Sequence, residues 1–180
     1  NAFHNLLHPF QPFIVGQRII GPAMAKKFGV KLVMYGENQA EYGNSIEENT
    51  NPIMNMDFFS SNDALSMKFG GVSMQEYIDT GRYTKDDFAP YIAPDKKDLI
   101  DNGIEVHYLG YYLKWDPQEC YYYSVDNTGF QANPVRTEGT YSKYSSIDDK
   151  IDPFHYLTTL IKFGIGRCTY DAAQEVRNDK

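Results

Sequence analysis

The stretch VKLVMYGEN at positions 30–38 decides the fold. Its first six residues are mostly apolar and predict a short buried strand, which Gly36 and the polar residues after it terminate. Ahead of this strand, Pro22 suits the first turn of a helix over residues 22–28, and Gly29 suits the end of that helix. A helix, a glycine, an apolar strand and a polar loop in this order predict half of a βαβ crossover.

The residues directly after this strand are candidate site residues, because ligands of such sheets lie outside the carboxyl ends of the strands. Gly36 allows a ligand to approach the backbone closely. Glu37 and Glu41 are four residues apart, so on a first helical turn they share a face and could hold Mg²⁺, with Asn38 adding a neutral oxygen. The alternative is a helix start whose acidic residues only favour the helix dipole.

The rest of the chain predicts a mixture of helices, one more strand and loops. We expect extended or turn backbone before residue 16, a long loop over 45–71, and a second strand over 105–113. Asp116 and Pro117 predict the start of a helix that ends near Gly129. Helices are also expected over residues 73–80, 85–91, 94–102 and 146–163, with Pro153 breaking or restarting the helix over 146–163, and over a last segment capped by Thr169.

Two later segments combine cations, hydroxyl groups and glycines. Residues 136–150 form a polar loop that could bind phosphate or sugar hydroxyl groups, although a solvated turn before a helix explains the pattern equally well. Residues 162–167, KFGIGR, place two cations around two glycines before the last helix, which is a possible anion site. The alternative there is a helix-to-helix turn with surface cations.

Composition excludes several classes of protein. The net charge of −7 argues against a general nucleic-acid binder, which usually has a basic face. The two cysteines, Cys120 and Cys168, lie far apart and predict neither a disulfide framework nor a zinc site, so we expect reduced thiols in a cytoplasmic protein. The sequence contains no apolar run long enough for a membrane span and no visible signal peptide.

Six strings follow one another along the chain: HPFQPFIVGQ (8–17), YGENQAEYGN (35–44), YLGYYLKWDP (108–117), RTEGTYS (136–142), SIDDK (146–150) and KFGIGR (162–167). In this order they resemble one known family, the N-acetyl sugar amidotransferases of lipopolysaccharide and flagellin-glycan biosynthesis (the WbpG type). The resemblance covers nearly the whole chain.

This resemblance implies an α/β fold of the adenine-nucleotide α-hydrolase kind, Rossmann-like with a mostly parallel sheet, and a family-specific helical insert. The implied parts are residues 1–45 and 105–180 of the nucleotide-binding domain, with residues 46–104 as the insert. It implies that ATP adenylates the acetamido oxygen of a nucleotide sugar and that ammonia then displaces AMP, leaving an acetamidino group. The implied partners are a HisH-like glutaminase and a HisF-like subunit that supply the ammonia.

The resemblance also implies roles for individual residues. Glu37, Asn38 and Glu41 are the expected catalytic residues, and Glu37 and Glu41 are the expected ligands of Mg²⁺. The residues expected to bind ATP are Gly36, Gln17, Lys162 and Arg167. Those expected to bind the sugar nucleotide are Lys114, Arg136, Tyr141, Lys143 and Asp149.

The chain departs from the family in one respect, because the SGGxDS loop that grips pyrophosphate in these enzymes is not found. We therefore expect a fragment that alone neither hydrolyses ATP nor makes product. A non-catalytic sugar-binding or docking module is the alternative, since the tyrosine-rich stretch 108–123 and Trp115 could stack on sugar rings. A weaker alternative is a tRNA-thiolating pyrophosphatase, against which the acidic composition counts.

Overall fold

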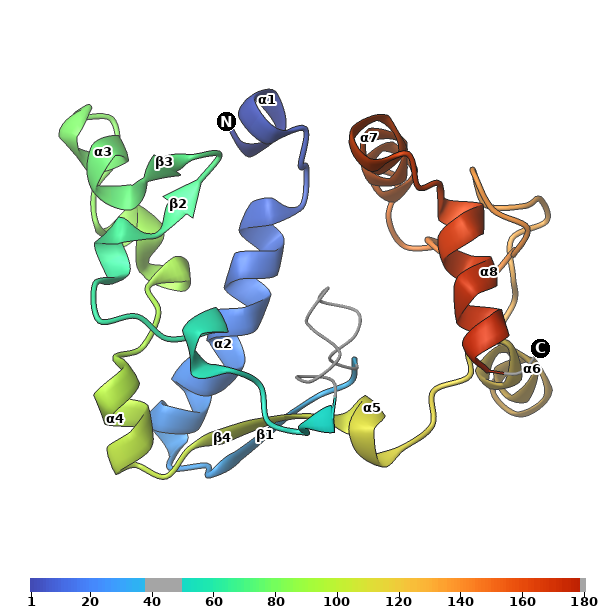
Figure 1. Cartoon of the computed structure of the whole chain (residues 1–180), viewed down its shortest axis with the longest axis horizontal. Helices are drawn as coiled ribbons and strands as arrows, with labels where there is room; N and C mark the ends of the chain where they lie inside the picture. Colours follow the sequence, from blue (N-terminus) through green and yellow to red (C-terminus); the bar gives the residue numbers. More distant parts are fainter. Residues whose placement is uncertain (38–49, 179–180) are drawn as a thin grey trace. The chain divides into compact units, whose positions relative to one another are not determined.

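The computed structural model describes residues 1–37 and 50–178, which form two compact units (Figure 1). The first unit comprises Asn1–Leu6 and Phe10–Lys114, and the second comprises Leu7–Pro9 and Trp115–Lys180. The strand over residues 105–108 belongs to the first unit.

The helix before the deciding strand is longer than the sequence predicts. Helix α2 covers Gln11–Phe28, and Pro12 lies in its first turn, where the missing N–H is tolerated. The expectation of extended or turn backbone before residue 16 is therefore wrong, and a short helix α1 (Ala2–Leu6) precedes α2. Gly29 ends α2 in the left-handed conformation with φ of 69°, as expected, and strand β1 (Leu32–Tyr35) follows.

Pro22 lies inside α2 rather than at its start, and Tyr35 explains why the helix continues. A proline offers no N–H to the carbonyl four residues earlier, which here belongs to Arg18. The Tyr35 hydroxyl donates to this carbonyl at 3.0 Å and to the Gln17 carbonyl at 2.8 Å. Gly21 makes room for this contact, because a Cβ there would lie 3.1 Å from the Tyr35 hydroxyl.

Strand β1 pairs in parallel with strand β4 (Glu105–Tyr108), which confirms a mixed α/β unit with a small parallel sheet. Val33 and Tyr35 pair with Val106 and Tyr108 and share the face that packs against α2. The second strand is shorter than the expected 105–113, because helix α5 (Leu109–Tyr112) begins where the partner β1 has ended. Met54 N–H donates to the Val106 carbonyl at 2.8 Å on the other side of β4.

The remainder of the first unit forms a second small core beside the sheet. Phe69, Met74, Tyr77 and Phe88 are buried in this core. The hairpin turn at Gly70, with φ of 62°, lies against Asn1 and Ala2 so closely that a Cβ would come within 2.8 Å of their backbone atoms. The elements of this region are η3 (Met56–Phe58), η4 (Ala64–Ser66), β2 (Lys68–Phe69), β3 (Val72–Ser73), α3 (Met74–Asp79), η5 (Asp86–Tyr91) and α4 (Lys96–Asp101).

The second unit consists of three helices and the long polar loop between the first two. Helix α6 (Pro117–Thr128) begins as predicted, since the Asp116 carboxylate accepts from the Glu119 N–H at 3.1 Å. Helix α7 (Asp152–Phe163) begins one residue before Pro153, and residues 146–151, which were expected to be helical, are instead part of the loop. Helix α8 (Arg167–Arg177) begins with Gly166 as its N-cap, and the expected cap at Thr169 is wrong.

Among the helices in residues 1–37 and 50–178, none combines the length and apolar character needed to cross a lipid bilayer.

Candidate functional site

The carboxyl end of β1 brings together three of the residues expected to bind ATP or its metal. Glu37 Oε1 accepts a hydrogen bond from Gln17 Nε2 at 3.3 Å, and the Glu37 carbonyl accepts from the Gly110 N–H at 3.2 Å. A Cβ on Gly36 would meet no atom of residues 1–37 or 50–178 within 4 Å, and the glycine is exposed. The edge of the parallel strands therefore presents a carboxylate, a carboxamide and accessible backbone.

Among the residues that the structure describes, Glu37 supplies the carboxylate that could bind a magnesium ion at this edge. Asn38 and Glu41 lie outside the described residues. In the described part of the chain, no group of three or more His, Cys, Asp or Glu side chains is placed to hold a metal ion. Mg²⁺ at nucleotide sites usually takes only one or two protein carboxylates and completes its shell with phosphates and water, so Glu37 fits such an ion as one ligand.

The remaining predicted residues divide between the two units. Lys114 is exposed at the end of the first unit. Arg136, Tyr141 and Lys143 lie on the exposed loop of the second unit, where Lys143 Nζ donates to the Pro134 carbonyl at 3.3 Å. Lys162 is exposed at the end of α7, and its ammonium group lies 5.2 Å from the centre of the Phe163 ring.

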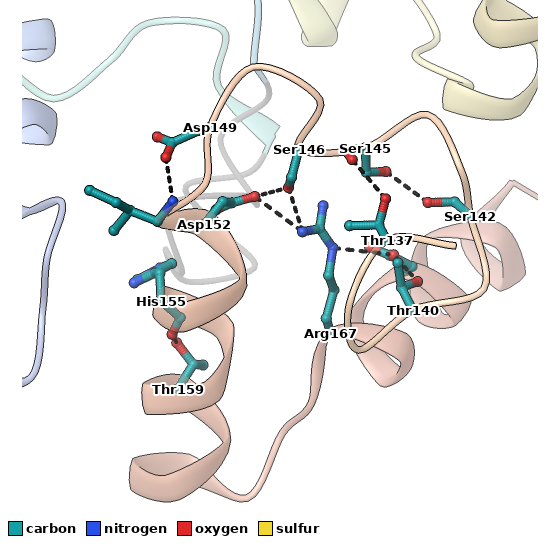
Figure 2. A network of polar contacts seen from close by, with 12 residues as sticks. Thr137, Thr140, Ser142, Ser145, Ser146, Asp149, Asp152, His155, Thr159 and Arg167 are labelled. Atoms are coloured by element: carbon teal, nitrogen blue, oxygen red, sulfur yellow. Dashed lines mark hydrogen bonds and ion pairs between the residues drawn. The ribbon is translucent and has the colours of Figure 1, made fainter. Parts of the chain in front are cut away.

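Arg167 is buried and its charge is already balanced by carboxylates, which the sequence pattern did not reveal. Its side chain is 6% exposed, and Nη1 donates to Asp152 Oδ2 at 3.1 Å and to Ser146 Oγ at 2.5 Å (Figure 2). Its Nε lies 3.8 Å from Asp171 Oδ2, and its guanidinium carbon lies 4.3 Å from the centre of the Tyr156 ring. We call Arg167, Ser146, Asp152 and Asp171 the arginine network.

This network fixes the polar loop onto helices α7 and α8. Ser146 has a φ of 52°, a conformation that a residue with a side chain rarely adopts, and its hydroxyl also donates to Asp152. Thr140 donates to Asp171 on α8, and the Cys168 N–H donates to the Gly139 carbonyl at 2.9 Å. The arginine network therefore holds the loop that carries the predicted substrate residues.

Asp149 has a local structural contact of its own within this loop. Its Oδ1 accepts from the Ile151 N–H at 2.7 Å just before α7 begins (Figure 2).

The same loop closes one side of an aromatic cavity in the second unit. The cavity has a volume of about 350 Å³, within the usual range of about 300–1,000 Å³ for small-molecule sites. Aromatic side chains line it from α6, from its flanks and from the loop: Trp115, Tyr121, Phe130, Tyr141 and Tyr144. Tyr121 and Tyr144 stack with ring centres 4.6 Å apart.

Helix α8 supplies the polar wall of the aromatic cavity. Asp171 and Glu175 are one helical turn apart and both line the cavity, together with Gln174. Their negative charge disfavours an anionic group inside the cavity, whereas a carboxylate oxygen accepts hydrogen bonds readily from a hydroxyl or an amide N–H. The aromatic cavity is therefore suited to a neutral ring that carries hydroxyl groups.

The cavity also keeps its phenol groups protonated. Burial raises the pKa of Tyr144 to about 12, and the charges of Glu175 and of nearby acidic groups add to this rise. Burial likewise raises the pKa of Tyr141, with Glu175 and Asp171 contributing. The Tyr144 hydroxyl donates to Gln118 Oε1 at 3.1 Å, and both phenols remain hydrogen-bond donors at neutral pH.

The sequence indicated only part of this cavity. Trp115 and Tyr121 belong to the tyrosine-rich stretch that suggested sugar stacking, and Tyr141 was among the predicted substrate residues. Asp171 and Glu175 were missed. Their spacing of four residues on a predicted helix was the available signal, but it is equally typical of a solvated helix face.

Comparison of the chain with protein-family models gives no match, and comparison with curated proteins gives none either.

Proposed function

We propose that this chain is part of an ATP-dependent N-acetyl sugar amidotransferase whose second unit binds the sugar of a nucleotide-sugar substrate. The aromatic cavity carries this proposal. Its stacked tyrosines offer flat apolar surfaces to the faces of a sugar ring, and its carboxylates accept from the ring hydroxyl groups. Protonated Tyr141 can donate to the acetamido carbonyl, the group that the reaction transforms.

The charge distribution around the loop supports the same orientation of the substrate. Asp171 and Glu175 would repel a diphosphate from the cavity, while Arg136 and Lys143 are exposed on the loop that also carries Tyr141. The nucleotide diphosphate would therefore lie against these cations, with the neutral sugar inside. Asp149 and Lys114, also expected at the substrate, remain predictions.

The residues at the carboxyl end of β1 and the family resemblance support ATP as the second substrate. Gly36 would let a phosphate approach the backbone, Gln17 would hold the Glu37 carboxylate in place, and Glu37 would ligate Mg²⁺. Bound ATP would supply the adenylyl group that turns the acetamido oxygen into a leaving group, which ammonia from a HisH-like glutaminase and a HisF-like subunit would displace.

Calorimetric titration of the 180-residue chain tests the sugar site. We expect UDP-N-acetylglucosamine to bind, UDP alone to bind more weakly, and Tyr121→Leu to weaken binding about three- to tenfold, which matches the worth of one aromatic stack. Tyr123→Leu is the matched control, because Tyr123 lies on the same helix but is 67% exposed and outside the cavity. If both variants bind UDP-N-acetylglucosamine with equal affinity, the aromatic cavity is not the sugar site.

The alternative function is a sugar-binding module without catalysis, and the same cavity favours it. Repeating the titration with ATP and Mg²⁺ separates the two. An amidotransferase part should bind the nucleotide sugar more tightly when ATP is present and lose that gain in Glu37→Gln, whereas a simple module should show no dependence on ATP.

A further inference from the structure

A chain of three hydrogen-bonded side chains lies on the face of β4 that points away from α2. Glu105 and His107 are two residues apart on the strand and so share this face, opposite Val106 and Tyr108 in the core. His107 Nε2 lies 3.0 Å from Glu105 Oε2, and His107 Nδ1 lies 2.7 Å from the Tyr112 hydroxyl. Tyr112 reaches back to the strand from helix α5.

These contacts define which atom holds each proton. A carboxylate can only accept a hydrogen bond, so His107 Nε2 carries the hydrogen and donates it to Glu105. In the neutral ring Nδ1 then has a lone pair, which accepts from the Tyr112 O–H. A carboxylate thus orients an imidazole whose basic nitrogen faces a hydroxyl group, the same arrangement that activates hydroxyl groups in hydrolases.

The exposed fractions of the side chains show which end of this hydrogen-bonded series a substrate can reach. The imidazole of His107 is largely shielded, with 14% of its side chain exposed, whereas Tyr112 is 50% exposed. A substrate would therefore meet the phenol oxygen rather than the ring nitrogen.

The tyrosine end of this hydrogen-bonded series lies beyond the carboxyl end of β4, whereas Glu105 is the first residue of that strand. Helix α5 follows the carboxyl end of β4, and the N–H of its Gly110 donates to the Glu37 carbonyl at 3.2 Å. Ligands of parallel sheets bind at this end of the strands. Helix α5 therefore brings Tyr112 to the end of the sheet at which such ligands bind.

We propose that Glu105, His107 and Tyr112 form a proton relay that removes a proton from a nitrogen of the substrate. The Tyr112 oxygen accepts the substrate proton while its own phenol proton passes to His107 Nδ1. The resulting imidazolium keeps its Nε2–H on Glu105 and later releases the proton to water, so that no net charge remains on the protein.

In the proposed amidotransferase reaction the nitrogen is that of the added ammonia, which must lose a proton before AMP leaves; this assignment rests on the proposed function. Tyr112 is the catalytic residue of the relay because it alone touches the substrate. His107 acts through Tyr112, and Glu105 is a positioning residue that fixes the tautomer of His107.

Acetylation of tyrosine by N-acetylimidazole, located by mass spectrometry, tests the relay in the full chain. Tyr111 is the internal control, because it is the neighbouring residue and is 52% exposed, almost as exposed as Tyr112, but makes no contact with His107 in the described part of the chain. Base assistance should make Tyr112 react at least about tenfold faster than Tyr111 near neutral pH.

Variants identify the base. In His107→Asn, the amide oxygen can take the place of Nδ1 and accept the hydrogen bond, but it cannot accept the proton. We expect this variant to lower the Tyr112 rate to that of Tyr111, and Glu105→Gln to give a smaller loss. Equal rates for the two tyrosines in the unaltered chain would overturn the relay, and so would a fast Tyr112 that is insensitive to His107→Asn.

The relay and the proposed function fail in different ways. If the cavity of the second unit does not bind a nucleotide sugar, the acetylation rates are unaffected and only the proposed function is lost. If the acetylation rates are equal while nucleotide sugar still binds, only the relay is lost.

Discussion

Replacing Arg167 with methionine should destabilise the second unit by about 3 kcal/mol. Removing one partner of a buried ion pair costs about 3–5 kcal/mol, because the other charge stays buried without compensation. Asp152 and Asp171 are 24% and 21% exposed, so water reaches both carboxylates and places the cost at the lower end of that range. Methionine fills much of the volume, so the loss is mainly electrostatic.

Urea unfolding followed by fluorescence of the single tryptophan measures this cost, because Trp115 lies in the second unit. We expect a lower midpoint with an unchanged dependence on urea. Lys162→Met is the matched control, since it removes an exposed cation from the last turn of α7 and should change stability by less than about 0.5 kcal/mol.

This experiment also decides between two roles for Arg167. The sequence predicted a phosphate ligand, whereas the structure commits its guanidinium to Asp152 and Ser146 (Figure 2). If Arg167→Met unfolds at the same urea concentration as Lys162→Met but no longer binds ATP, the structural role is refuted and the phosphate role is supported.

Two further predictions concern one hydrogen bond and one pair of rings. Tyr35→Phe removes the donor to the Arg18 carbonyl and should lower the free energy of unfolding by about 1–3 kcal/mol. In a Pro22→Ala background the loss should be clearly smaller, because the N–H of the new alanine can donate to the same carbonyl. Additive losses in a double-mutant cycle would contradict this. His8 and His155 stack with ring centres 5.1 Å apart, and burial lowers the pKa of both, so the unfolded chain binds more protons. The stability that the neutral histidines contribute to the second unit should therefore be complete above the ordinary imidazole pKa of 6.5 and should decrease as the pH falls below that value. Urea midpoints at about pH 7.5 and about pH 5 measure this decrease, which His155→Gln should reduce. An equal decrease in the variant and the unaltered chain would contradict the prediction.

Features set by neighbouring residues could be predicted from the sequence. Gly29 and Gly129 both end helices in the left-handed conformation, and Asp116 caps its helix, because each needs only the backbone within one turn. The apolar strand after Gly29 was predicted for the same reason. The second strand was predicted from its β-rich composition, although its parallel pairing with β1 was not.

Features that depend on distant partners could not be predicted. Pro22 suggested a helix start because its missing N–H is tolerated there, but Tyr35 supplies a donor inside the helix. The residues after Tyr108 have strand-like composition, yet β1 ends at Tyr35 and no strand in the described part of the chain continues beside them. Arg167 looked like an anion ligand because its neighbours in sequence are glycines, while its acidic partners come from α7 and from the next turn of α8.

The Tyr35 hydroxyl joins the last residue of β1 to the middle of α2, so the two cannot shift independently. Any displacement of the strand end by a molecule settling beside Gly36 must either carry the helix with it or open the backbone around Pro22. Binding of a ligand beside Gly36 would then change the rate of amide hydrogen exchange in the middle of α2, although that part of the helix is distant in sequence from the sheet edge.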